Sequence, residues 1–240
     1  MSLNVFKESN EAIEALAKVF VEKAKTAIAQ NNKFSVALSG GSSPKKLYDV
    51  LANNYAEAID WTKVYFFFGD ERYVAHDHAD SNYLLAKNGL FDALPINENQ
   101  IFKVDTSLDP ASAALEYQRS ICAFFDNKTS FDLIILGLGD DAHTASIFPN
   151  TALIWIDEEL VKEVYLEDKK VYRISFTAPL INQAKEIAFL TFGANKADAI
   201  KAVLEGEKDV EQYPAQLIKP VNGNLSWFVD EAAVSKLEKK

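Results

Sequence analysis

Short apolar segments recur along the chain, and longer segments with helical spacing separate them. A continuous run of apolar and β-branched residues is typical of a strand buried on both faces, and strict alternation is typical of a strand buried on one face. Strands are predicted at residues 34–40, 61–71, 101–105, 132–136, 171–177, 187–193 and 225–234.

Helices are predicted where apolar residues recur every three or four positions between these strands. Strands that alternate with helices of this length predict an α/β fold: a doubly wound, mostly parallel sheet with helices on both faces. No proline- or glycine-rich stretch and no block of charge divides the chain, so we expect residues 1–240 to form a single domain. The predicted helices are 8–31, a helix from Pro44 onward, 81–92, 110–125, 196–204 and a helix at the end of the chain.

The overall charge narrows the classes of partner. A net charge of -10 and a pI near 4.9 argue against nucleic acid, whose binding depends on clustered lysine and arginine. No apolar segment reaches the roughly 18 residues that a membrane span needs, and residues 1–20 have the pattern of an amphipathic helix rather than of a signal peptide. We therefore expect a cytoplasmic protein with no nucleic-acid and no membrane partner, and we favour a monomer.

The chain contains one cysteine, Cys122, and three histidines. A single cysteine excludes a disulfide within the chain and a thiolate metal cage. His76 and His78 have the spacing of a metal-binding pair on a strand, but they lie in the polar run AHDHADSN, which is typical of a solvated loop. We predict no metal site from these residues.

The strand predicted at 34–40 runs into a turn of sequence SGGSSP. Pro44 is suited to the first position of the following helix, with Ser43 as its cap. Backbone N–H groups freed by Gly40 and Gly41, together with the helix dipole, favour an anion at this point. The turn therefore predicts a phosphate cradle, although a tight strand–helix connection that binds nothing has the same pattern.

The arginines are the cations to locate if the substrate is an anion, and there are only three: Arg72, Arg119 and Arg173. Arg119 is expected on a helix surface. Arg72 follows a predicted strand in the sequence GDER, so its planar guanidinium can grip a phosphate at the edge of the sheet. A salt bridge to Asp70 or Glu71 is the structural alternative, and both can hold together.

Lys196, in the sequence GANKA, follows another predicted strand and opens a helix. Its ammonium group could reach the same edge of the sheet as a further positive charge. A lysine at the start of a helix is more often simply solvated.

Residues 133–149, LIILGLGDDAHTASIFP, join a buried strand to a glycine-rich turn that carries a histidine. Gly137 and Gly139 allow a tight turn and a close approach of the backbone to a ligand. Asp141 and His143 follow at the carboxyl end of the strand, where open α/β sheets place their ligands. These residue types predict a general base and an aspartate that fixes its tautomer, which together activate water. A lone histidine that caps a helix or fills a polar niche is the alternative.

The segments SGGSSP, GDERYV, GLGDDAHTASIFP, RISFT, GANKA and PAQLIKP occur in this order, and with them the chain resembles the 6-phosphogluconolactonases over nearly its whole length. The resemblance implies a sugar-phosphate isomerase-like fold. It also implies hydrolysis of 6-phospho-D-glucono-1,5-lactone to 6-phospho-D-gluconate in the pentose phosphate pathway, with no metal and no organic cofactor.

The resemblance further implies a role for each matching residue. His143 would be the catalytic base and Asp141 its partner. Backbone N–H groups of the 137–143 turn, which contains Gly137 and Gly139, are candidates for stabilising the oxyanion. The residues implied to hold the substrate phosphate are Gly40, Gly41, Ser42, Arg72 and Lys196.

One position departs from the family pattern, because Ala142 stands where these loops usually have glycine. If the turn needs a positive φ there, alanine costs about 1 kcal/mol or more and can shift His143.

Two alternatives to the lactonase function stay open. A glucosamine-6-phosphate deaminase or isomerase shares a similar loop, but its DGHIAFNEP differs from the AHTASIFP of this chain. The second alternative function is that of a non-catalytic sugar-phosphate-binding protein.

Overall fold

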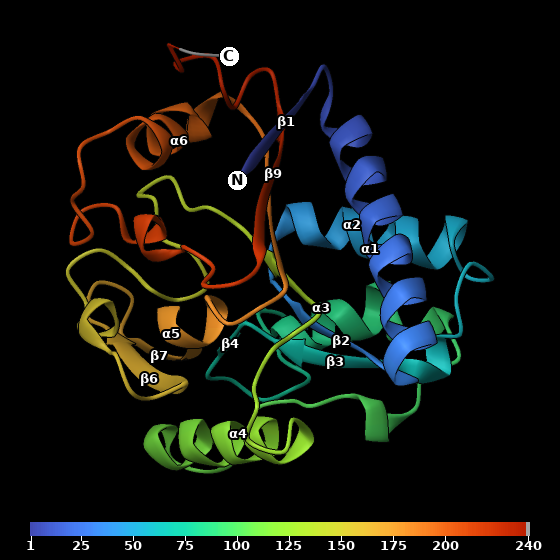
Figure 1. Cartoon of the computed structure of the whole chain (residues 1–240). Coiled ribbons are helices and arrows are strands. Elements are labelled where there is room, and N and C mark those ends of the chain that lie inside the picture. The colour runs from blue at the N-terminus through green and yellow to red at the C-terminus, as the bar shows by residue number, and fades with distance from the viewer. Residues whose placement is uncertain (239–240) are drawn as a thin grey trace.

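A six-stranded parallel sheet forms the centre of the molecule in the computed structural model, which describes residues 1–238 (Figure 1). The strand order is β1-β9-β8-β5-β2-β3, so successive strands are added on one side of β2 and then on the other. The direction changes between β2 and β5, and such a point is where doubly wound sheets open a crevice for ligands. The strands are β1 (Ser2–Phe6), β2 (Phe34–Leu38), β3 (Val64–Phe68), β5 (Leu133–Leu136), β8 (Glu186–Thr191) and β9 (Asn224–Asp230).

Helices cover both faces of this sheet, which confirms the predicted fold class. One face packs against α1, α2 and α3, and the other against α4, α5 and α6. The helix starts follow local rules: Asp109 caps α4 by accepting a hydrogen bond from the Ser112 N–H at 3.1 Å, and Pro110 is its first residue. The helices are α1 (Ser9–Asn31), α2 (Ser42–Asn54), α3 (Asn82–Gly89), α4 (Pro110–Phe124), α5 (Ala178–Ile181) and α6 (Ala197–Leu204).

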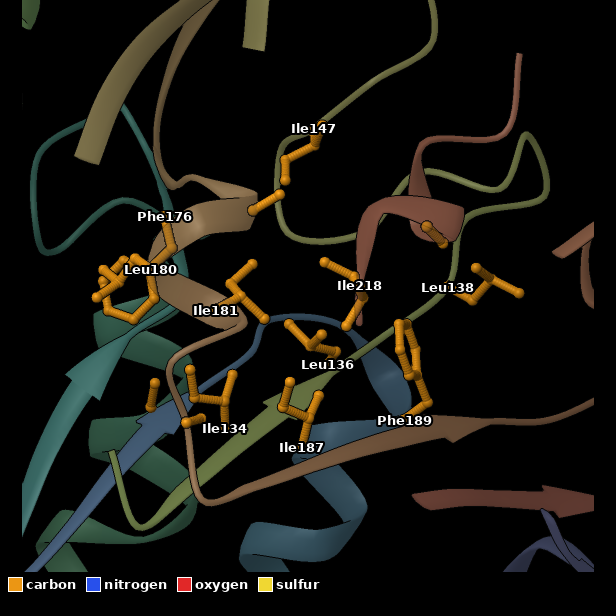
Figure 2. Packing of buried hydrophobic residues seen from close by; sticks show 14 of the residues in the cluster. Ile134, Leu136, Leu138, Ile147, Phe176, Leu180, Ile181, Ile187, Phe189 and Ile218 are labelled. Carbon is orange, nitrogen blue, oxygen red and sulfur yellow. The ribbon is translucent and has the colours of Figure 1, made fainter. Parts of the chain in front are cut away.

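Strand β5 is buried on both faces and holds the glycine-rich turn in place. Leu133 and Ile135 belong to the hydrophobic cluster under α1 and α2, whereas Ile134 and Leu136 belong to the opposite cluster. Figure 2 shows Ile134 and Leu136 within that second cluster, close to α5. Because every residue of β5 packs in one of the two hydrophobic cores, the end of the strand that leads into the turn has a fixed position.

A small antiparallel sheet lies beside the main one and consists of β4 (Asp70–Arg72), β7 (Val171–Phe176) and β6 (Val161–Leu166), in that order. Gly69 joins the two sheets, because its N–H donates to Leu38 and its carbonyl accepts from Phe176. This arrangement places Arg72 directly opposite Arg173.

For several predicted elements, the boundaries or the type of secondary structure are wrong. The strand predicted at 61–71 is a 3-10 turn, β3 and the short β4. Residues 101–105 form no strand, since only Ile101 makes an isolated bridge. The helix predicted after β9 is replaced by turns over residues 231–236.

Two strands were missed. Residues 1–20 were interpreted as helical, but the first of them form β1, a short edge strand whose residues are mostly part-exposed. In strand β6 the polar residues Lys162 and Glu163 interrupt the apolar positions, so neither strand has the continuous apolar run that identified β5. No helix among residues 1–238 is long and apolar enough to cross a membrane.

Candidate active site

A cavity of about 300 Å³ opens at the carboxyl ends of β2 and β5, where the direction of the sheet changes. A larger hollow of about 900 Å³ lies on the other side of the 140–142 turn, but no histidine or arginine lines it. The smaller cavity is therefore the candidate active site. Its lining residues are Ser39, Gly40, Gly41, Asp70, Arg72, Gly137, Leu138, Gly139, His143, Ala145, Ser146, Phe148, Lys169, Arg173 and Lys196.

The imidazole of His143 is fixed on two sides. Its Nδ1 lies 2.5 Å from Oδ1 of Asp141, and the backbone N–H of His143 donates to the same oxygen at 3.1 Å. The ring also stacks on Phe148, with the centroids 4.0 Å apart. Since Nδ1 is engaged and His143 lines the cavity, Nε2 is the ring nitrogen left to contact a ligand or a water.

The carboxyl group of Asp141 is held in its charged form. Partial burial by itself would raise the pKa of Asp141, but the hydrogen bond and charge of the His143 side chain and the backbone N–H of His143 outweigh it and lower the pKa to about 2. The carboxylate oxygen Oδ1 can accept a hydrogen bond from Nδ1–H, and the ring tautomer protonated at Nδ1 carries its free lone pair on Nε2.

The turn that carries His143 is closed by its own backbone. The Gly139 N–H donates to the His143 carbonyl at 2.8 Å, and the Ala142 N–H donates to the Gly139 carbonyl at 3.0 Å. A Cβ at Gly139 would lie 2.0 Å from Nδ1 of His143, so a side chain there would displace the imidazole. The turn therefore needs glycine at position 139.

Ala142 adopts a φ of 61°, so the position does require the left-handed conformation that glycine favours. Its side chain is buried, and its carbonyl accepts from the Ala215 N–H at 3.0 Å. The turn forms with alanine in this place, and the Asp141–His143 hydrogen bond is intact.

Some of the backbone N–H groups predicted to stabilise the oxyanion already donate hydrogen bonds within the turn. The N–H groups of Gly139, Ala142 and His143 donate within the turn. Of the remaining members, Gly137 and Leu138 line the cavity.

The glycine turn after β2 begins its helix earlier than predicted. Helix α2 starts at Ser42 with Gly41 as its N-cap, at a φ of 105°, rather than at Pro44 with Ser43 as cap. Gly40 and Gly41 line the cavity, and neither N–H donates to another described backbone or side chain. Ser42 follows them but does not line the cavity.

Gly40 also has no room for a side chain, because a Cβ there would lie 1.9 Å from the Asn82 side chain. The amide of Asn82 donates to the Asp70 carbonyl at 2.8 Å. This contact joins the glycine turn to the start of β4, which leads to Arg72.

Arg72 forms no salt bridge with Asp70 or Glu71 in the described chain, contrary to the structural alternative. Its Nη1 donates to the Asp80 carbonyl at 2.8 Å, and its buried Nε has no partner. Glu71 instead receives the backbone N–H of Arg72 at 2.7 Å and further N–H groups at the start of α3. Burial raises the pKa of Glu71.

Lys196 does reach the cavity, but its charge is already paired. Its Nζ lies 2.6 Å from Oδ1 of Asp140, and the amide of Asn195 donates to the same oxygen at 3.0 Å. The positive charge of Lys196 is therefore partly neutralised by the carboxylate of Asp140.

Sequence reasoning missed two further cations of the cavity, Arg173 on β7 and Lys169 in the turn before it. The Lys169 ammonium lies 4.7 Å from the centroid of the Phe148 ring. Both depend on the β6–β7 hairpin, and β6 has no strong apolar pattern. Within residues 1–238, no three His, Cys, Asp or Glu side chains are grouped as metal ligands would be.

Comparison with known proteins identifies the family. The sequence model of the glucosamine-6-phosphate isomerases/6-phosphogluconolactonase family matches residues 7–227, and the chain belongs to this family. It is 40% identical over 216 residues to a 6-phosphogluconolactonase of Synechocystis sp., covering 88% of each chain. It is 37% identical to a 6-phosphogluconolactonase of Nostoc sp., covering 98% of each.

Solved structures agree with the sequence relatives. The 6-phosphogluconolactonase of Trypanosoma cruzi superposes with a TM-score of 0.88 at 25% identity, over 99% of this chain and 97% of that one. The 6-phosphogluconolactonase of Thermotoga maritima gives a TM-score of 0.83 at 28% identity, over 95% and 99%.

Proposed function

We propose that this protein hydrolyses 6-phospho-D-glucono-1,5-lactone to 6-phospho-D-gluconate in the pentose phosphate pathway. The observation that carries the proposal is the Asp141–His143 pair at the rim of a cavity lined by four lysine and arginine side chains. Full-length similarity to curated 6-phosphogluconolactonases supports the choice of substrate.

His143 acts as the general base in this proposal. Nε2 takes a proton from a water as the water oxygen attacks the lactone carbonyl carbon, and Asp141 stabilises the imidazolium that forms. The tetrahedral oxyanion then collapses, the bond from C1 to the ring oxygen breaks, and the ring oxygen takes the proton back from Nε2. The products are a carboxylic acid, which ionises, and a free hydroxyl group.

In this proposal the phosphate of the substrate binds to a second group of cavity residues. The free N–H groups of Gly40 and Gly41, with Ser42 beside them at the start of α2, form an anion cradle. Arg72 offers a guanidinium with an unused Nε–H. Lys196 would add a positive charge at the rim.

A glucosamine-6-phosphate deaminase is the alternative enzyme, and the fold does not decide between the two. A monomeric enzyme of that class superposes with a TM-score of 0.84 at 18% identity, which is a likeness of fold alone. The curated relatives named above favour the lactonase. A binding protein without catalysis is disfavoured because Asp141 still holds His143 although Ala142 replaces glycine.

The direct test is stopped-flow hydrolysis of freshly made 6-phospho-D-glucono-1,5-lactone, followed by proton release against the spontaneous background. A parallel assay measures ammonia release from glucosamine 6-phosphate. Fast lactone hydrolysis without ammonia release is expected. Ammonia release without lactonase activity would overturn the proposal in favour of the deaminase, and neither activity would favour the binding protein. A single-domain, monomeric and cytoplasmic enzyme without nucleic-acid partners stays a prediction.

A further inference from the structure

Two arginines lie side by side in the cavity, on neighbouring strands of the small sheet. Arg72 on β4 and Arg173 on β7 are register partners in an antiparallel pair, and both line the cavity. Directly opposite residues on such strands point to the same face, with Cβ atoms about 4.5–5.5 Å apart. Like charges in this relation destabilise a sheet, so the pair calls for a functional reason.

No carboxylate neutralises this pair at short range. In the chain from residue 1 to 238, neither guanidinium has a carboxylate oxygen within 4.0 Å. Burial first, and then the charge of Arg72, lower the pKa of Arg173, whereas the charges of Asp70, Asp80 and Glu71 act in the opposite direction. Positive charge therefore accumulates here at a cost to the ligand-free protein.

The two guanidinium groups also retain unused hydrogen-bond donors. Arg72 donates from Nη1 to the Asp80 carbonyl, but its buried Nε–H has no partner. Arg173 donates from Nη1 to the carbonyl of its neighbour Tyr172 at 3.2 Å. Each guanidinium has five N–H donors, and most of them have no hydrogen-bond partner among residues 1–238.

Arg119, the third arginine of the chain, differs from Arg72 and Arg173 in its environment. Arg119 lies on the exposed surface of α4 and pairs with Glu116 one turn earlier in the helix. It has the surface ion pair that Arg72 and Arg173 both lack. Arg119 is therefore a natural control for any test of the other two.

We propose that Arg72 and Arg173 form a two-arginine clamp for the phosphate group of the substrate, in which Arg173 is a binding residue and determines the preference for a phosphorylated lactone. The inference rests on the proposed lactonase function. A phosphate dianion between the two groups would accept hydrogen bonds from both and neutralise both charges. The clamp is distinct from Lys196, whose charge is already paired with Asp140.

The test compares Arg173→Gln, Arg173→Lys and the control Arg119→Gln. For each protein, kcat/KM is measured on 6-phospho-D-glucono-1,5-lactone and on unphosphorylated glucono-1,5-lactone. Arg173→Gln is expected to lose about 10- to 100-fold on the phosphorylated substrate, mainly through KM, since hydrogen bonds to charged groups have this magnitude. The loss on the unphosphorylated lactone is expected to be much smaller, so the ratio of the two kcat/KM values falls. Arg173→Lys recovers part of the loss, and Arg119→Gln behaves as wild type.

A thermal measurement separates binding from a structural role. Without ligand, Arg173→Gln is expected to have a Tm equal to or above that of the wild type, because a like charge beside Arg72 is removed. The rise in Tm caused by 6-phosphogluconate becomes smaller than in the wild type. A lower Tm with an unchanged response to 6-phosphogluconate would show that Arg173 is structural and overturn the clamp.

The clamp and the proposed function fail in different ways. If the wild-type protein does not hydrolyse the phosphorylated lactone above background, the proposed function is wrong and the clamp falls with it. If the wild type is active and Arg173→Gln keeps both KM and the preference for the phosphorylated substrate, only the clamp is wrong.

Discussion

The cavity has two halves that differ in how far their polar groups are satisfied. Around His143, the ring nitrogen Nδ1, the backbone N–H groups and the carboxylate of Asp141 all have partners. Arg72 and Arg173 are register partners on β4 and β7, and neither guanidinium has a close carboxylate among residues 1–238. The first half is organised without a ligand, whereas the second has no carboxylate counter-charge of its own at short range. Under the proposed function, catalysis would occur in the first half and phosphate recognition in the second.

Removing the base should give the largest effect on turnover. In His143→Ala, kcat is expected to fall by about 10²- to 10⁴-fold, the usual contribution of a general base. Stopped-flow hydrolysis measures this, with background hydrolysis subtracted. His76→Ala is a matched control, because His76 bonds the Val104 carbonyl and does not line the cavity. An unchanged kcat in His143→Ala would contradict the assignment of the base.

Weakening the support of the base should have the next largest effect. Asp141→Asn cannot stabilise the imidazolium, so kcat is expected to fall by about 10²-fold with KM little changed. Steady-state kinetics at neutral pH measure both constants. A rise in KM without a fall in kcat would show that Asp141 acts in substrate binding rather than in catalysis.

Loss of Arg72 should affect the recognition half. Arg72→Gln is expected to raise KM for the phosphorylated lactone by about 10- to 100-fold, because a charged donor to phosphate is lost. The same initial-rate assay on unphosphorylated lactone should show little change. Equal losses on the two substrates would mean that the phosphate binds elsewhere.

The pH dependence of stability should reveal the charged state of Asp141. Its pKa of about 2 in the folded protein lies below the ordinary value of about 3.9, so its contribution is complete above pH 4 and is lost as the pH falls toward 2. The difference in unfolding free energy between wild type and Asp141→Asn should therefore shrink as the pH falls below 4. Denaturant unfolding at each pH tests this. A difference that is undiminished at pH 2.5 would rule out a depressed pKa.

The smallest effect is expected at Ala142. Glycine would relieve the positive φ, worth about 1 kcal/mol, but it also increases the freedom of the unfolded chain. We expect the free energy of unfolding of Ala142→Gly to change by less than about 1 kcal/mol, with an equal or higher rate. Urea unfolding and kcat together check this. A clear loss of rate would show that the buried methyl group positions His143.

The two halves also differ in how far the sequence predicts them. Asp141 and His143 are two residues apart, after a strand whose apolar run is unmistakable, so local pattern places them correctly. Arg173 faces Arg72 only because β4 pairs with β7. That pairing joins segments about a hundred positions apart, and Lys162 and Glu163 interrupt the apolar pattern of the intervening β6. The recognition half thus depends on long-range pairing that no local pattern contains.

The separation of chemistry from recognition is tested most directly by isothermal titration of 6-phosphogluconate into His143→Ala and Arg72→Gln. The account predicts that His143→Ala binds with nearly the wild-type Kd although it turns over little substrate, whereas Arg72→Gln binds at least tenfold more weakly. If His143→Ala loses as much affinity as Arg72→Gln, the two halves do not act separately and the account is wrong.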